Sequence, residues 1–118
     1  KVEIRLFSAI RPADEPAKML RRNGVDPSPL LEGDNFRPMA TFASHFELWR
    51  RCSQGDDPYL IMDHDAILEK QLPPVMFQYG IHICKGVYVI NPPGAIYLMD
   101  EAKIAASPIN DFLKLLDV

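Results

Sequence analysis

Two aspartates flanking a histidine, Asp63-His64-Asp65, directly follow a short apolar run at residues 59–62. The length and composition of that run predict a buried central strand. Ligands of open α/β sheets bind beyond the carboxyl ends of the strands, where carboxylates can face a cation and a sugar or phosphate. Mg²⁺ and Mn²⁺ prefer such oxygen ligands. Asp63 and Asp65 are therefore candidate metal ligands, and the alternative is a simple turn in which they accept backbone hydrogen bonds.

The composition of the chain limits its class. Its 118 residues suffice for one domain with one core, and 47% hydrophobic with 25% charged residues is ordinary for a soluble globular protein. The net charge of -3 and the absence of a long basic block argue against a nucleic-acid partner. No run of eighteen apolar residues predicts a membrane span. The two cysteines lack metal-site spacing, so we expect reduced thiols and a cytoplasmic location.

The sequence of the first half of the chain predicts a strand, a helix, a loop and a second helix, in that order. Residues 2–10 alternate as a strand does, and the acids at 14–15 with the Asn23-Gly24 stop predict a short helix between them. Residues 25–37 are predicted to form a loop. Pro38 opens the clearest amphipathic helix, on which Phe46 and Trp49 are expected in the core. His45 lies at the edge of its apolar stripe, where it is either a structural residue or a ligand.

The second half predicts a hairpin followed by two helices. Residues 75–83 and 87–90 read as strands, and the residues between them are few enough for a hairpin loop. Asn91 followed by proline predicts a helix start, with the helix running to about residue 106. Ser107-Pro108 repeats this signature for a last helix.

Four segments occur in the order typical of glycosyltransferase family 25: FASHFELWRRC, DDPYLIMDHDAIL, GVYVINPPGAIYLMDEA and SPINDFL. The first carries Ser44-His45 and Trp49, and the second ends in Asp63-His64-Asp65 where the family has an acidic triplet. The third supplies Tyr88 and Gly94-Ala95, and the fourth supplies Pro108 and Asp111 of a Pro-x-Asp pattern. Arg11 matches the arginine after the family's first strand. The chain thus resembles this family, which includes lipooligosaccharide glycosyltransferases and collagen galactosyltransferases.

The resemblance implies a compact GT-A-like (Rossmann-like) α/β fold with a mixed, mostly parallel sheet flanked by helices. Residues 1–118 would form one domain, shorter than is usual in the family. The implied activity is metal-dependent transfer of a sugar from a nucleoside diphosphate-sugar, such as a UDP-sugar, to a glycan or another hydroxyl acceptor. Lipopolysaccharide biosynthesis is one setting for such an activity.

The resemblance also implies roles for individual residues. Asp63 and Asp65 would bind Mn²⁺ or Mg²⁺, which assists departure of the diphosphate. Asp111 would be the general base or an acceptor contact, and its alternative role is to stabilise a helix start. The implied substrate-binding residues are Arg11, Ser44, His45, His64 and Tyr88.

Two other functions stay open. The chain could be a non-catalytic domain, derived from that fold, that binds a nucleotide-sugar or a protein, because fold does not fix function. His64-Asp65 could also belong to an HD-type phosphohydrolase, but that chemistry needs several further histidines, and only His45 and His82 remain.

Overall fold

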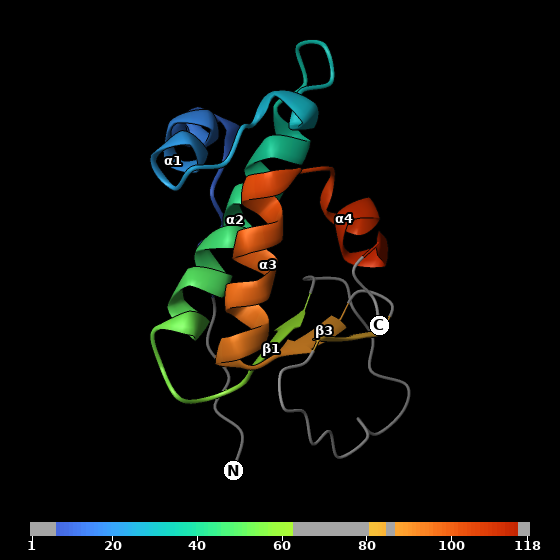
Figure 1. The fold of residues 1–118 in the computed structure, drawn as a ribbon. Coiled ribbons are helices and arrows are strands. Elements are labelled where there is room, and N and C mark those ends of the chain that lie inside the picture. Colours follow the sequence, from blue (N-terminus) through green and yellow to red (C-terminus); the bar gives the residue numbers. More distant parts are fainter. Residues whose placement is uncertain (1–6, 63–80, 85–86, 116–118) are drawn as a thin grey trace.

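A computed structural model describes residues 7–62, 81–84 and 87–115 of the chain (Figure 1). These residues form four α-helices, three strands and two short 3-10 helices. The helices are α1 (Pro16–Arg22), α2 (Arg37–Ser53), α3 (Pro92–Ile104) and α4 (Ile109–Leu115). The strands are β1 (Tyr59–Met62), β2 (Ile81–Cys84) and β3 (Val87–Ile90), and the 3-10 helices are η1 (Pro12–Asp14) and η2 (Ser28–Leu30). Helices α2 and α3 lie side by side, with the sheet at one end of the pair (Figure 1).

The sheet contradicts the predicted GT-A-like, mostly parallel arrangement. Its strand order is β1-β3-β2, and both pairings within the described residues are antiparallel. Cys84 pairs with Val87, so only two residues connect β2 to β3. A parallel pair needs a crossover of a dozen or more residues, whereas a connection this short can only form a hairpin. The predicted hairpin is thus confirmed, and the parallel sheet taken from the family resemblance is wrong.

Strand β1 lies at the edge of the described sheet, not at its centre. Ile61 is 7% exposed, whereas Leu60 and Met62 on the other face are 37% and 44% exposed. This alternation is typical of a strand with one buried face. The prediction of a buried central strand at residues 59–62 was therefore correct in its bounds and wrong in its position, and β3 is the middle strand.

The first predicted strand, at residues 2–10, is not seen where the structure describes it. Residues 7–10 lie in no strand, and the remainder of that prediction lies outside the described residues. The backbone N–H of Ile10 donates a hydrogen bond to the side chain of Ser44 on α2, at 2.8 Å. Because a helix side chain satisfies this N–H, it is not available to a sheet partner.

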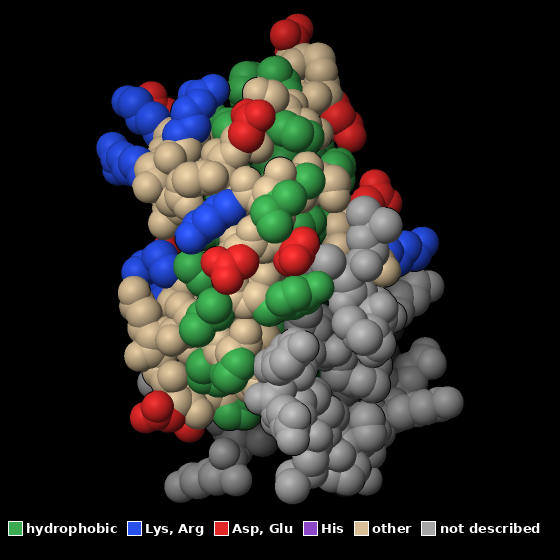
Figure 2. Space-filling model, in the orientation of Figure 1, with side chains coloured by type: hydrophobic (Ala, Val, Ile, Leu, Met, Phe, Trp, Pro, Cys, Tyr) green, Lys and Arg blue, Asp and Glu red, His purple; other side chains and the backbone are tan. Residues whose placement is uncertain are grey.

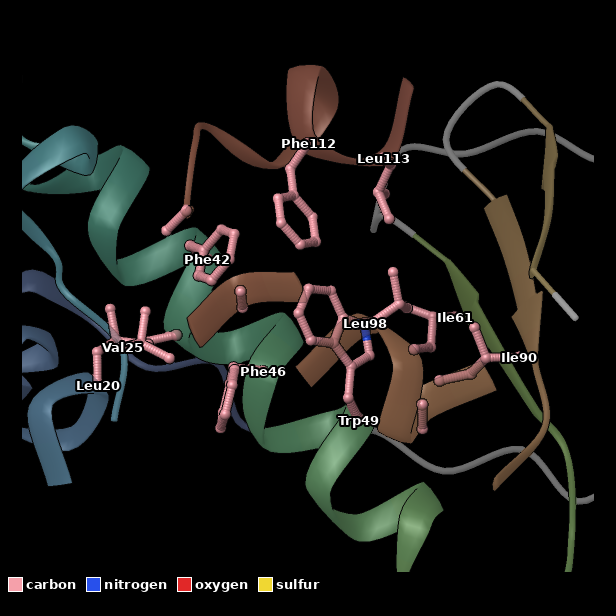
Figure 3. Packing of buried hydrophobic residues seen from close by; sticks show 14 of the residues in the cluster. Leu20, Val25, Phe42, Phe46, Trp49, Ile61, Ile90, Leu98, Phe112 and Leu113 are labelled. Carbon is pink, nitrogen blue, oxygen red and sulfur yellow. The ribbon is translucent and has the colours of Figure 1, made fainter. Parts of the chain in front are cut away.

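Helix α2 supplies the middle of the core. Phe42, Phe46 and Trp49 are fully buried and follow one another at helical spacing, as predicted. On α3, Ala95 and Leu98 are also fully buried, and α2 and α3 form the largest helix–helix contact (Figure 3). Small residues such as alanine on α3 allow the two helices to approach closely. The core therefore extends along these two helices and also includes buried residues of α1, η2, α4 and the sheet.

The predicted helix ends are largely confirmed. Helix α1 stops at Asn23-Gly24, where Gly24 adopts φ +80°, a conformation that favours glycine. The side chain of Asn91 caps α3 by accepting a hydrogen bond from the backbone N–H of Gly94 at 2.9 Å. These local signals fix where α1 ends and where α3 begins, and the core then decides how the helices pack.

The surface drawn in Figure 2 has no single charge sign. Lys and Arg side chains gather mainly over α1, which carries Lys18, Arg21 and Arg22. Over α3, acidic and hydrophobic side chains are interspersed, and two isoleucines there, Ile96 and Ile104, are 48% and 77% exposed. Single exposed apolar residues are normal on protein surfaces.

Candidate functional site

A buried polar contact joins His45 and Trp49 of α2 to Tyr88 of β3. The Trp49 Nε1–H donates a hydrogen bond to the Tyr88 hydroxyl at 2.9 Å, and His45 Nδ1 lies 2.5 Å from the same oxygen. The His45 ring also stacks on the Tyr88 ring, with centroids 5.6 Å apart and an interplanar angle of 18°. His45, Tyr88 and Trp49 are 9%, 4% and 0% exposed. Two of the residues implied by the resemblance, His45 and Tyr88, are thus brought into direct contact.

The Tyr88 hydroxyl can form hydrogen bonds with Trp49 and His45 at the same time. An indole N–H only donates, so the hydroxyl oxygen must accept from Trp49. A tyrosine hydroxyl retains one hydrogen and a second acceptor site, and the tautomer of His45 decides which of these the imidazole uses. The arrangement holds the His45 ring in one orientation, which supports the structural role that the sequence left open for it.

Replacing Tyr88 with phenylalanine is expected to lower the free energy of unfolding by about 1–3 kcal/mol. The substitution keeps the ring but removes the acceptor of a buried N–H, and an unpaired buried donor costs that much. Trp49 is the single tryptophan, so its fluorescence in a urea titration reports on this contact directly. Tyr59→Phe, at a half-buried position, is the matched control and should change the stability by less than about 0.5 kcal/mol. Equal losses in both variants would contradict the prediction.

Ser44 has a structural role that the sequence did not indicate. Its hydroxyl accepts from the Ile10 backbone N–H at 2.8 Å and lies 2.9 Å from the Ala40 carbonyl oxygen, to which it donates. The side chain is buried, with the residue 8% exposed. Ser44 therefore joins the segment before η1 to the middle of α2 by a hydrogen bond. Its hydroxyl both accepts and donates a hydrogen bond within the fold.

Arg11 lies on the surface beside η1. Its side chain is 76% exposed, and its Nε lies 3.4 Å from an Asp14 carboxylate oxygen. The backbone N–H of Arg11, followed by its guanidinium, lowers the pKa of the Asp14 carboxyl. This local pair leaves most of the Arg11 side chain accessible to a ligand, as a substrate-binding role requires.

Asp111 lines a surface hollow of about 390 Å³ between the starts of α2 and α4. The polar side chains of this hollow include Arg37 and Thr41 from α2 and Asn110 beside Asp111 on α4. All four of these residues are exposed. The sequence singled out Asp111 but not Arg37 or Thr41, because nothing local indicates that two helix starts so far apart in the chain meet.

The residues predicted to bind the metal, Asp63 and Asp65, lie outside the described residues, as does His64. Strand β1 ends at Met62, the residue directly before Asp63. In the β1–β3 ladder, Ile61 is opposite Tyr88. The strand that leads into the acidic motif therefore pairs with the strand that carries Tyr88. In the ranges described on either side of the motif, no three His, Cys, Asp or Glu side chains form a metal-binding group.

No protein-family model, no curated protein sequence and no solved structure matches this chain. The similarity to glycosyltransferase family 25 therefore stays a prediction, carried by the motif residues. Of the helices that the structure describes, none combines the length and the apolar character needed to cross a membrane.

Proposed function

We propose that the chain acts in metal-dependent glycosyl transfer, moving a sugar from a nucleoside diphosphate-sugar to a hydroxyl of a glycan or another acceptor in the cytoplasm. The observation that carries the proposal is the position of Trp49. Its indole donates to Tyr88 at 2.9 Å, and its ring stacks on Phe112, the neighbour of Asp111, at 5.7 Å. One side chain therefore links three of the segments on which the resemblance rests.

The chemistry of the acidic motif is suited to the proposed reaction. Asp63 and Asp65 offer the hard oxygen donors that Mn²⁺ and Mg²⁺ prefer. When bound, such an ion offsets the negative charge of the departing nucleoside diphosphate. Asp111, exposed at the start of α4, can accept a proton from an acceptor hydroxyl or hold that hydroxyl by a hydrogen bond.

Nucleotide binding is expected to depend on the metal and on Asp65. A diphosphate beside two carboxylates is repelled unless a cation lies between them, so calorimetry should detect UDP binding with Mn²⁺ and none with a chelator. Asp65→Asn removes one ligand charge and keeps the side-chain size. It should weaken metal-dependent UDP binding by roughly 5- to 150-fold, the range of a charge-assisted contact.

The matched control for this titration is Asp100→Asn, an exposed aspartate on α3 that should leave UDP affinity unchanged. Equal UDP affinity with Mn²⁺ and with a chelator would contradict the proposal. So would a failure to bind UDP in either condition.

A second function is favoured by the burial of two residues implied to bind substrate. Ser44 and His45 are 8% and 9% exposed, and both make hydrogen bonds within the fold. A non-catalytic domain that binds a protein, or that binds a nucleotide-sugar through other residues, would tolerate this arrangement. Release of UDP from UDP-sugars, measured with and without a panel of acceptor sugars, separates the two functions: binding without release favours the non-catalytic domain.

A further inference from the structure

The hollow at the starts of α2 and α4 has groups that recognise a polyhydroxylated ligand. Arg37 supplies a guanidinium that only donates hydrogen bonds, and Asp111 supplies a carboxylate that only accepts them. Thr41 and Asn110 add groups that do both. Apolar side chains of Pro38, Pro108 and Ile109 also line the hollow. Sugar rings present hydroxyls at their edges and C–H groups on their faces, so both kinds of surface have a counterpart here.

The charges of the lining favour a neutral ligand. Arg37 and Asp111 contribute one charge of each sign, and none of the ion pairs found among the described residues joins the two. Each charged group is therefore able to contact a ligand between them. A phosphate would gain from Arg37 but would be repelled by Asp111. The volume of about 390 Å³ lies near the lower end of ligand sites, which commonly measure ~300–1000 Å³, and this size favours a single sugar over a nucleotide-sugar.

The backbone that carries these groups is held firmly. The Asn35 side chain accepts a hydrogen bond from the Arg37 backbone N–H at 3.1 Å, which fixes the first residue of α2. On α4, Phe112 is 3% exposed and contacts the Phe42 ring edge-on, with centroids 5.2 Å apart. Because Phe112 directly follows Asp111, this aromatic contact fixes the backbone of Asp111 relative to α2. The backbone positions of Arg37 and Asp111 are therefore set before any ligand arrives.

We propose that this hollow binds one neutral hexopyranose, held between Arg37 and Asp111 and bordered by Thr41 and Asn110. That this sugar is the acceptor of the transfer rests on the function proposed above. The sugar-binding site does not depend on that function. The proposal adds Arg37, Thr41 and Asn110 to the residues that the resemblance implied, and it gives Asp111 a ligand on which to act.

The test is an NMR titration of the ¹⁵N-labelled full chain with methyl β-galactopyranoside, methyl α-glucopyranoside and inorganic phosphate, each added separately. At least one glycoside should shift the amide signals of residues 35–37, 39–41 and 109–112 in a saturable way. Arg37→Ala and Asp111→Asn should each weaken that binding by roughly 10- to 100-fold, because each removes a hydrogen bond to a charged group. The matched controls are Arg22→Ala at the end of α1 and Asp100→Asn on α3, which should leave it unchanged.

Several results would overturn the sugar site: shifts confined to other segments, no saturable shift with either glycoside, or phosphate binding there instead. Unchanged sugar affinity in both Arg37→Ala and Asp111→Asn would overturn it as well. Unfolding midpoints of the two variants close to that of the parent chain ensure that a lost signal reports on binding. The UDP titration with Mn²⁺ is run on the same samples. Sugar binding without UDP binding would keep the site and remove the transferase function, and the reverse would remove only the site.

Discussion

Replacing Phe42 with alanine is expected to lower the free energy of unfolding by about 3–5 kcal/mol, the usual cost of a phenylalanine deleted from a core. The side chain is fully buried. Its ring meets Trp49 edge-on at 5.6 Å and Phe112 edge-on at 5.2 Å. The substitution therefore leaves a cavity where α2 meets α4. A domain of this size is stable by only about 5–15 kcal/mol, so a large share of the stability would be lost.

Urea titration followed by far-UV circular dichroism measures this loss. The matched control is Phe36→Ala, since Phe36 is 44% exposed and precedes α2 on the surface. Because Phe36 buries much less apolar surface than Phe42 does, its loss should lower the free energy of unfolding clearly less than that of Phe42. Similar losses for Phe42 and Phe36 would mean that α4 does not pack against α2 through Phe112 as the structure has it.

The helices were predictable because their signals are local. The apolar spacing of Phe42, Phe46 and Trp49 indicates one buried face without reference to any other element. Likewise, Asn91 lies within four residues of the N–H group that it caps. Such signals depend on residues that are close in the chain, so the sequence alone is enough to read them.

The sheet was predictable only in part, because strand pairing is not local. The two-residue connection between Cys84 and Val87 required a hairpin, and this much was read correctly. Which strand lies in the middle depends on how β1 meets β3, and no spacing in the sequence contains that information. The parallel sheet was taken from the family resemblance, and the antiparallel register of Ile61 with Tyr88 overturns it.

In the candidate site, too, the residues could be named from the sequence, but their contacts with distant residues could not. His45 and Tyr88 were both named from the resemblance, but their contact joins residues 43 positions apart and required the fold. The sequence likewise could not indicate that the Ser44 hydroxyl accepts a hydrogen bond from the Ile10 backbone N–H, since only the packing of residues 7–10 on α2 brings the two residues together. Arg37 and Thr41 were not predicted as site residues, because only the packing of α4 beside the start of α2 places them in the same hollow as Asp111.

The thiol of Cys52 gives the fold a specific sensitivity to alkaline pH. The residue is fully buried, and its Sγ lies 3.7 Å from the carbonyl oxygen of Asp57 and 3.9 Å from that of Ile90. Burial raises the pKa of the Cys52 thiol from its ordinary value of 9.0 to about 11, although a backbone hydrogen bond from Tyr59 acts in the opposite direction. Carbonyl oxygens accept from a thiol but repel a thiolate, so the surroundings of the sulfur also favour the protonated form.

The stability of the chain is therefore expected to fall between pH 9 and pH 11 through Cys52. Below pH 9 the thiol is protonated in both the folded and the unfolded state, and its full contribution is present. As the pH rises toward 11, the unfolded chain loses this proton while the folded chain keeps it, which favours unfolding. A pKa difference of about two units corresponds to a loss of roughly 2–3 kcal/mol in the free energy of unfolding.

Free energies of unfolding are to be measured in urea at intervals from pH 8 to pH 11 for the parent chain and for Cys52→Ala. Tyrosine and lysine residues titrate in both proteins, and both retain Cys84, so the difference between their pH profiles isolates Cys52. The variant should be less stable than the parent chain near pH 8, because the sulfur is lost from the core, and the gap should narrow as the pH rises. A gap that stays constant over this range would show that the Cys52 thiol ionises as readily in the folded chain as in the unfolded one.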